Sequence, residues 1–299
     1  MINVGITGGE TVAAGELVRL LINHPDVAIK WIFSNHEHGA ISNFHKGLLG
    51  ECDLKIQDSI DDDVDIIFCC DLESEELCEN ALLNNTHLRV VDLTRSISNN
   101  DTYMYGLCEI NRKFMVHNCY GVVRMPSPQA MLTLLSVIPL AVDHKIESDI
   151  NVDIQCGQLT EVIEDAKLKD ELTDVLLALQ PGFNGNINVS TRSDGTTMRG
   201  IATTVKLACN KDIDSIKERY IDYYDDHNFT YVSDRNVGIA DVANTNKCLL
   251  QLSSDGDTLT VKAVGDSLLK GCAGNAVHVM NLLFGLHERV GLGLKAQVF

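Results

Sequence analysis

The sequence predicts an α/β protein of two domains, in which an N-terminal doubly wound parallel sheet is followed by an α+β domain. Three observations predict this fold class. Short apolar segments with the pattern of buried strands alternate with helical segments early in the chain (2–6, 28–34, 64–70 and 88–93). From residue 148 the strands include a hairpin around Ser253–Asp257. The 299 residues are enough for two hydrophobic cores, so we expect domains over 1–147 and 148–272.

The first strand, turn and helix have the pattern that opens a Rossmann domain. Residues 2–6 form the strand, Gly8 and Gly9 the turn, and residues 13–24 the helix. Gly5, Gly8 and Gly9 would let the main chain approach a pyrophosphate, whose charge the helix N-terminus attracts. A complete G-x-G-x-x-G is absent, so a turn that binds nothing stays open as the alternative.

The second strand ends at Ser34 and Asn35, where a Rossmann fold meets the adenine ribose. Small polar residues leave room for a 2′-phosphate, so this pair favours NADP, with an ordinary loop as the alternative. Histidines and a glutamate follow in the same region (His36, Glu37, His38 and His45). They have no i,i+4 pair on a helix, so we expect solvated surface here and no metal site.

The remaining elements follow from apolar periodicity. In the first part we expect a helix over 73–83 and a long apolar helix that stops at Pro139. In the second part we expect strands over 149–156, 198–207, 246–252 and 258–264, and helices over 160–179, 213–225 and 274–286. Because one pair of these strands is a hairpin, the second sheet should be mainly antiparallel.

Composition excludes several classes of protein. The formal net charge of −18 disfavours nucleic acid as a partner. Apolar stretches fall short of the roughly 18 residues that span a bilayer, and the N-terminus lacks the pattern of a signal peptide, so we expect no membrane association. The ten cysteines are scattered without a C-x-x-C pair, which indicates reduced thiols and a cytoplasmic protein.

Five segments carry a resemblance to a known family: Gly15–Asp26, Tyr105–Glu109 with Asn111-Arg112, Met198–Thr203, Asn244–Lys247 and Asp266–Ala276. Together they resemble the N-acetyl-gamma-glutamyl-phosphate reductases, relatives of aspartate-semialdehyde dehydrogenase. The resemblance implies a Rossmann domain, a second α+β domain of the semialdehyde-dehydrogenase type that forms the subunit contact, and a C-terminal helix, within 273–299, that returns to the first domain. It also implies NADP as cofactor and a homo-oligomer, a dimer or a tetramer.

The family's reaction, as the resemblance implies it, reduces an acyl phosphate to a semialdehyde in arginine biosynthesis. A cysteine thiolate attacks the acyl carbon, phosphate leaves, and hydride from NADPH discharges the thioester. Counting back from Pro139, the family's P-G-C motif falls on Pro126-Ser127-Pro128, so Pro128 occupies the position of the nucleophile. Ser127 instead has the features of an N-cap, with proline at the first helical position.

Other residues of this sequence also differ from the family's cofactor-binding and catalytic residues. The family's third loop glycine falls on Thr11, and Glu10 before it would repel a pyrophosphate unless it turns away. The family's substrate loop is not matched by residues 157–160, and no histidine between His144 and His227 is present to act as acid/base. These departures indicate loss of the family's reaction.

Three further residues are candidates for site roles. Cys119, two residues after His117, offers a displaced nucleophile, because a nearby histidine can activate a thiol. On a strand the two side chains would share a face without necessarily touching, and a buried small side chain is the alternative. Asn275 could bond a nicotinamide carboxamide or only help a helix to pack. Arg199 could bind an anionic substrate or form a surface ion pair.

Two classes of function are therefore open. The first is an NADP-dependent oxidoreductase that reduces an acyl phosphate. The second is a catalytically inactive paralogue that acts as a binding or regulatory subunit, with copies of itself or a complete paralogous reductase as partner.

Overall fold

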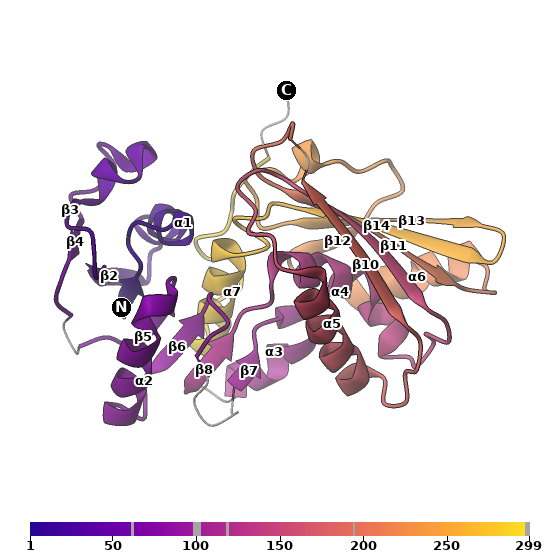
Figure 1. The fold of residues 1–299 in the computed structure, drawn as a ribbon, viewed down its shortest axis with the longest axis horizontal. Helices are drawn as coiled ribbons and strands as arrows, with labels where there is room; N and C mark the ends of the chain where they lie inside the picture. Colours follow the sequence, from indigo (N-terminus) through magenta and orange to yellow (C-terminus); the bar gives the residue numbers. More distant parts are fainter. Residues whose placement is uncertain (61–62, 98–102, 118–119, 194, 297–299) are drawn as a thin grey trace. The chain divides into compact units, whose positions relative to one another are not determined.

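The computed structural model describes residues 1–60, 63–97, 103–117, 120–193 and 195–296. The chain forms two compact units (Figure 1). The first consists of Met1–Pro126 with Cys272–Gly293, and the second of Ser127–Gly271 with the last residues. Among the described residues, no helix combines the length and apolar character needed to cross a membrane.

The first unit is built on an eight-stranded sheet in the order β3-β4-β2-β1-β5-β6-β8-β7. All of its pairings are parallel except that of β3 with β4. The strands are β1 (Ile2–Thr7), β2 (Val27–Phe33), β3 (Gly39–Ala40), β4 (Lys55–Gln57), β5 (Ile66–Cys69), β6 (Arg89–Asp92), β7 (Tyr103–Tyr105) and β8 (Gly121–Arg124). Because β1 lies between β2 and β5, the sheet is doubly wound as predicted.

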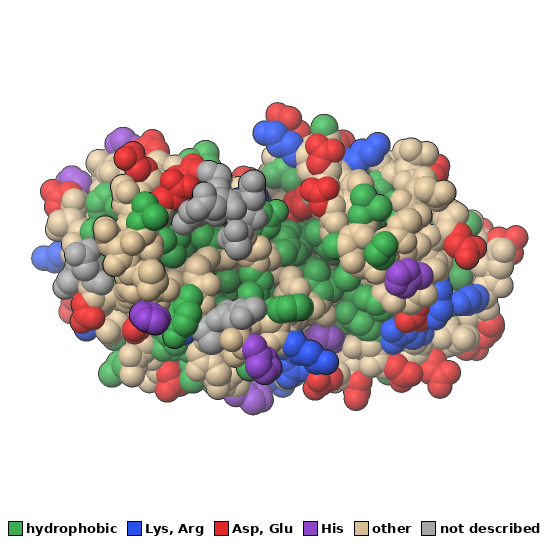
Figure 2. Space-filling model, turned by 90° about the horizontal axis from the view of Figure 1, so that it is seen from below, with side chains coloured by type: hydrophobic (Ala, Val, Ile, Leu, Met, Phe, Trp, Pro, Cys, Tyr) green, Lys and Arg blue, Asp and Glu red, His purple; other side chains and the backbone are tan. Residues whose placement is uncertain are grey.

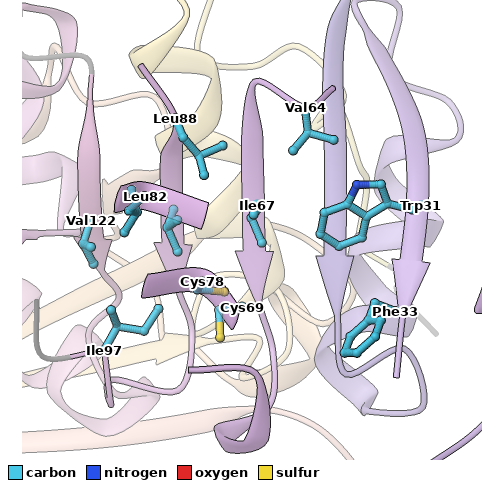
Figure 3. Close-up of a cluster of buried hydrophobic side chains, with 11 residues drawn as sticks. Trp31, Phe33, Val64, Ile67, Cys69, Cys78, Leu82, Leu88, Ile97 and Val122 are labelled. Carbon is cyan, nitrogen blue, oxygen red and sulfur yellow. The ribbon is translucent and has the colours of Figure 1, made fainter. Parts of the chain in front are cut away.

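The helices of the first unit are α1 (Val12–Leu21), α2 (Glu75–Asn84), α3 (Cys108–His117) and α7 (Ala273–Leu283). α7 packs against both α1 and α3 although it is far from them in sequence. α2 packs against β5 and β6. Cys78 and Leu82 of α2 join Trp31, Ile67 and other strand residues in one buried cluster (Figure 3).

The second unit contains a six-stranded mixed sheet in the order β10-β9-β11-β14-β13-β12. Its three central pairings are antiparallel and the two outer pairings are parallel. The strands are β9 (Ile150–Cys156), β10 (Ile187–Ser193), β11 (Ile201–Ala208), β12 (Thr230–Val232), β13 (Cys248–Asp255) and β14 (Thr258–Gly265). Buried and exposed residues alternate along β9 and β11, as expected where one face of a sheet is covered.

Three helices lie along one side of this sheet in Figure 1: α4 (Pro128–Ala141), α5 (Asp165–Leu179) and α6 (Ile213–Tyr224). α4 is buried along all 14 of its residues and packs against β11, β14 and α5. This packing places α4 in the second unit, so the unit boundary lies at 126/127 and not at the expected 147/148. α5 begins at Asp165 and not at Thr160, because Thr160 is buried in a turn, where its hydroxyl donates to the carbonyl of Gly200.

The prediction that α4 stops at Pro139 is wrong, because the helix continues to Ala141. Proline lacks the N–H that would bond the carbonyl of Leu135, and an unpaired buried carbonyl is costly. The hydroxyl of Tyr224 in α6 donates to that carbonyl at 2.6 Å and replaces the missing donor. The neighbouring Tyr220 donates to the carbonyl of Ser136, also at 2.6 Å.

We expect Tyr224→Phe to lower the free energy of unfolding by about 1–2 kcal/mol, because the carbonyl of Leu135 loses its donor. In a Pro139→Ala background the same substitution should cost clearly less, since residue 139 then supplies an N–H. Tyr220→Phe is the matched control, because the carbonyl of Ser136 has a helical donor in Leu140. Urea unfolding of the single and double variants measures this coupling, and equal costs in both backgrounds would contradict the explanation.

Candidate functional site

The glycine turn lies between β1 and α1, at the carboxyl end of the parallel strands. Gly8 has a φ of +63°, a conformation that favours glycine. The N–H of Gly9 donates to the carbonyl of Phe33 at 3.1 Å and ties the turn to the end of β2, next to Ser34. Gly5 has a different role inside β1, since a Cβ there would lie 2.2 Å from a ring carbon of Trp31.

Thr11 is the N-cap of α1. Its Oγ1 accepts a hydrogen bond from the N–H of Ala14 at 3.2 Å, and its own N–H donates to the carbonyl of Gly8 at 2.8 Å. Such caps satisfy the donors that a helix start otherwise offers to solvent or to an anion. Thr11 therefore serves the start of the helix.

Two carboxyl groups border this turn. Asp71 follows β5, and a Cβ on Gly8 would lie 3.0 Å from its Oδ1. Its Oδ2 accepts a hydrogen bond from Ser74 at 3.0 Å. Asp71 Oδ1 and Glu10 Oε2 are both buried, and neither has a hydrogen-bond partner among the described residues.

Ser34 is buried, and its Oγ accepts hydrogen bonds from the N–H groups of His36 at 3.1 Å and Glu37 at 3.2 Å. Asn35 is exposed. His36 is also exposed and bonds Glu73 at 2.5 Å. Within the described ranges, no group of three His, Cys, Asp or Glu side chains is placed to hold a metal ion.

Asn275 is fully buried in the first turn of α7 and its amide is engaged on both sides. Nδ2 donates to the carbonyl of Gly106 at 2.8 Å, and Oδ1 accepts from the thiol of Cys108 at 3.9 Å. These bonds join α7 to the start of α3, which matches the packing role considered for this residue.

At the start of α4, Ser127 is fully buried and is the N-cap, with Pro128 as the first helical residue. Its Oγ accepts from the N–H of Ala130 at 3.2 Å and donates to Oε2 of Glu171 at 2.6 Å. The other oxygen of Glu171 accepts from the N–H of Ser127 at 3.0 Å. A Cβ on Gly271 would lie 2.9 Å from Cβ of Pro128, so the proline packs closely on that glycine.

Arg199 forms a bidentate ion pair with Asp266. Nη2 donates to Oδ1 at 2.9 Å, and Nε lies 2.7 Å from Oδ2. The Asp266 carboxyl group is completely buried, whereas the Arg199 side chain is 23% exposed. This is the ion-pair alternative for Arg199, although the partner lies inside the unit and not at its surface.

Two of the described cysteines, Cys70 and Cys156, are poorly suited to act as nucleophiles. Cys119 lies outside the described residues. His117 ends helix α3, where its ring bonds the carbonyl of Lys113 at 2.7 Å, so the expectation that it lies on a strand is wrong. Burial raises the pKa of the Cys70 thiol well above its usual value, and raises that of Cys156 to about 11. Raised pKa values reduce the thiolate fraction that attacks an acyl carbon.

Comparison with known proteins identifies the family. The chain is 35% identical to the N-acetyl-gamma-glutamyl-phosphate reductase of Phocaeicola vulgatus and 34% identical to that of Parabacteroides distasonis. Both matches cover 100% of this chain and 100% of the relative. The chain belongs to the N-acetyl-gamma-glutamyl-phosphate reductase family.

Two wider comparisons agree with this assignment. The family described as semialdehyde dehydrogenase, NAD binding domain, matches residues 3–117. The fold is similar to that of aspartate semialdehyde dehydrogenase II from Vibrio cholerae, with a TM-score of 0.74 at 15% identity over 95% of this chain and 98% of that chain. It is also similar to the Candida albicans enzyme solved with NADP, with a TM-score of 0.71 at 12% identity over 95% and 98%.

The first unit is thus an NAD(P)-binding domain by family and by fold. The fit of its residues to a dinucleotide is poor at the turn. The backbone of Gly8 has the required conformation, but Thr11 caps the helix that would face a pyrophosphate, and the unpaired oxygens of Glu10 and Asp71 border the same turn. Buried carboxylate oxygens without a hydrogen-bond donor oppose the approach of another anion.

Sequence reasoning missed three acidic residues that contact the candidate site residues. Asp71 lies at the glycine turn, Glu171 binds Ser127, and Asp266 binds Arg199. Asp71 has a detectable signal, because it directly follows a predicted strand at the edge where doubly wound sheets bind ligands. Glu171 and Asp266 have none, because each reaches its partner across tens of residues of sequence.

Proposed function

We propose that this member of the N-acetyl-gamma-glutamyl-phosphate reductase family lacks the family's thiol-dependent reduction and acts as a non-catalytic binding or regulatory subunit. One observation carries the proposal, the packing at the start of α4. By the family resemblance the nucleophile position falls on Pro128, which has no nucleophilic atom and packs on Gly271. A covalent intermediate needs an attacking atom at this point, and the position supplies none.

Ser127 supports a second candidate, a serine-dependent acyl transfer, because its hydroxyl donates to a carboxylate at 2.6 Å. Its surroundings favour a structural role instead. The hydroxyl oxygen is fully buried and accepts the N–H of Ala130, and Glu171 binds the Ser127 main chain as well as its side chain. An oxygen held in this way has no path to an acyl carbon.

The proposed partners are other copies of this chain, in a dimer or a tetramer, or a complete reductase of the same family. The family resemblance supports this part of the proposal, since its members associate through the second domain. NADP, the family's cofactor, has no step in the proposed function, because the residues at the glycine turn do not fit it. Light scattering of the purified protein, alone and mixed with a complete reductase, measures both kinds of assembly.

The test is an assay of the purified full-length chain for oxidation of N-acetylglutamate semialdehyde in the presence of phosphate and NADP, the reverse of the family's reaction. We expect no turnover above buffer, at protein concentrations where the Phocaeicola vulgatus relative reacts readily. A circular dichroism spectrum and a melting curve establish that the protein assayed is folded.

Turnover in the wild-type chain would overturn the proposal, and two variants would then locate the nucleophile. Loss of the rate in Ser127→Ala at preserved folding would assign the reaction to the serine. Loss in Cys119→Ser would assign it to the displaced thiol, whereas we expect Cys119→Ser to leave any measured rate unchanged.

A further inference from the structure

We propose that the carboxylates of Glu10 and Asp71 close the glycine turn of the first unit to dinucleotides, so that these two residues determine the ligand selectivity of the turn. This inference concerns the nucleotide-binding edge and uses none of the residues at the start of α4. It therefore stands or falls independently of the proposed function.

Three main-chain donors of the glycine turn and of the first helical turn are already bonded within the chain. In a Rossmann domain the pyrophosphate is held by N–H groups of the glycine turn and of the first helical turn. Here Gly9 donates to the carbonyl of Phe33, Thr11 donates to the carbonyl of Gly8, and Ala14 donates to Oγ1 of Thr11. An anion at this turn would have to displace the cap before it could bond Ala14.

The charge at the turn has the wrong sign for a pyrophosphate. Glu10 lies within the turn, one residue before the N-cap, and Asp71 reaches the turn from the end of β5. The buried oxygens Glu10 Oε2 and Asp71 Oδ1 have no hydrogen-bond partner among the described residues, so no donor stabilises a negative charge on these two atoms. Coulomb repulsion between a carboxylate and a phosphate is strong at short range.

A histidine beside the turn does not compensate these charges. His45 packs against Gly15 of α1, and its Nε2 donates to the carbonyl of Gly9 at 2.7 Å. That bond directs the ring toward the main chain and away from a phosphate. The overall charge of −18 adds no attraction for an anion, and acidic side chains are spread over the face shown in Figure 2.

Removing the two charges should open the turn. In Glu10→Gln/Asp71→Asn both side chains keep nearly the same shape, and their amide groups can donate hydrogen bonds to phosphate oxygens. We expect the affinity of this variant for NADPH to exceed that of the wild type at least about 100-fold, since each removed like charge at contact distance contributes about tenfold or more.

The experiment is a calorimetric titration of the full-length protein with NADPH, and with NADH for comparison. The matched control is Glu76→Gln/Asp174→Asn, which changes the net charge equally at two exposed positions outside the turn. We expect no measurable binding by the wild type or the control, and saturable binding by the turn variant.

Two outcomes would overturn the inference. One is binding of NADPH by the wild type in the micromolar range, and the other is a folded turn variant that gains no affinity. An equal gain in the control would also contradict it, because the effect would then come from net charge alone. If the double variant does not fold, the single variants Glu10→Gln and Asp71→Asn take its place, each with an expected gain of about tenfold.

Discussion

Replacing Asp266 by alanine is expected to lower the free energy of unfolding by about 3–5 kcal/mol, because the substitution removes the fully buried partner of an ion pair and the acceptor of three main-chain N–H groups. The carboxylate accepts the Arg199 guanidinium at 2.7 and 2.9 Å. It also accepts the main-chain N–H groups of Asn244 at 2.6 Å, Leu268 at 2.9 Å and Leu269 at 3.1 Å. In the alanine variant all of these donors lose this acceptor, and buried donors are costly to leave unpaired.

Urea unfolding of wild type and variant measures this effect, with Asp174→Ala as an exposed control in the same unit. Asp266→Asn keeps one acceptor oxygen and loses the charge, so its cost should lie between those of wild type and alanine. A cost of less than about 1 kcal/mol for Asp266→Ala would mean that the network contributes little. That result would reopen Arg199 as a residue available to an anionic ligand.

Replacing Glu288 by alanine is the second substitution with a large expected effect, again about 3–5 kcal/mol. Its nearly buried carboxylate lies 2.6 Å from Nη2 of Arg112 in α3 and 2.6 Å from Nε2 of His278 in α7. The carbonyl of Glu288 also accepts from Nδ2 of Asn281 at 3.1 Å. Loss of the side chain should therefore loosen the segment after α7 from both helices.

Hydrogen exchange distinguishes this local loosening from a general loss of stability. We expect faster exchange in residues 284–293 and in the last turn of α7, with the sheet of the first unit less affected. Glu76→Ala is the control, because that side chain is exposed on α2. Unchanged exchange after α7 would show that packing of α7 on α1, and not the carboxylate, holds the segment in place.

Local sequence patterns were sufficient for the fold class and for most element positions. β1, the glycine turn and α1 follow from neighbouring residues, since apolar periodicity and the conformational freedom of Gly8 act within a few positions. The same holds for the hairpin of β13 and β14, whose turn lies between Asp255 and Thr258. The predicted end of α4 at Pro139 was wrong, because the carbonyl of Leu135, which the proline leaves without a donor, accepts a hydrogen bond from Tyr224 in another helix.

The N-cap role of Ser127 was predicted from its neighbours and is confirmed, whereas the roles of Arg199 and Asn275 stayed open between alternatives. The sequence placed Ser127, Arg199 and Asn275 at points where a member of this family would carry chemistry. In the structure each has a partner within the chain, and for Asn275 and Ser127 these partners occupy both sides of the polar group. A position along the chain gives no information on the hydrogen-bond partners that folding brings to it.

The sequence by itself determined that this protein has a Rossmann-like first domain, a mixed second domain and a place in the reductase family, because these depend on short-range patterns and on recognisable segments. Only the tertiary structure decided how the polar groups are used. Asp71 meets Gly8, Glu171 meets Ser127, and Asp266 meets Arg199 from 67 residues away. Such contacts depend on how the strands and helices pack and on the register of that packing. Packing brings together residues that are far apart in the sequence, and the sequence between them does not indicate that they will be in contact.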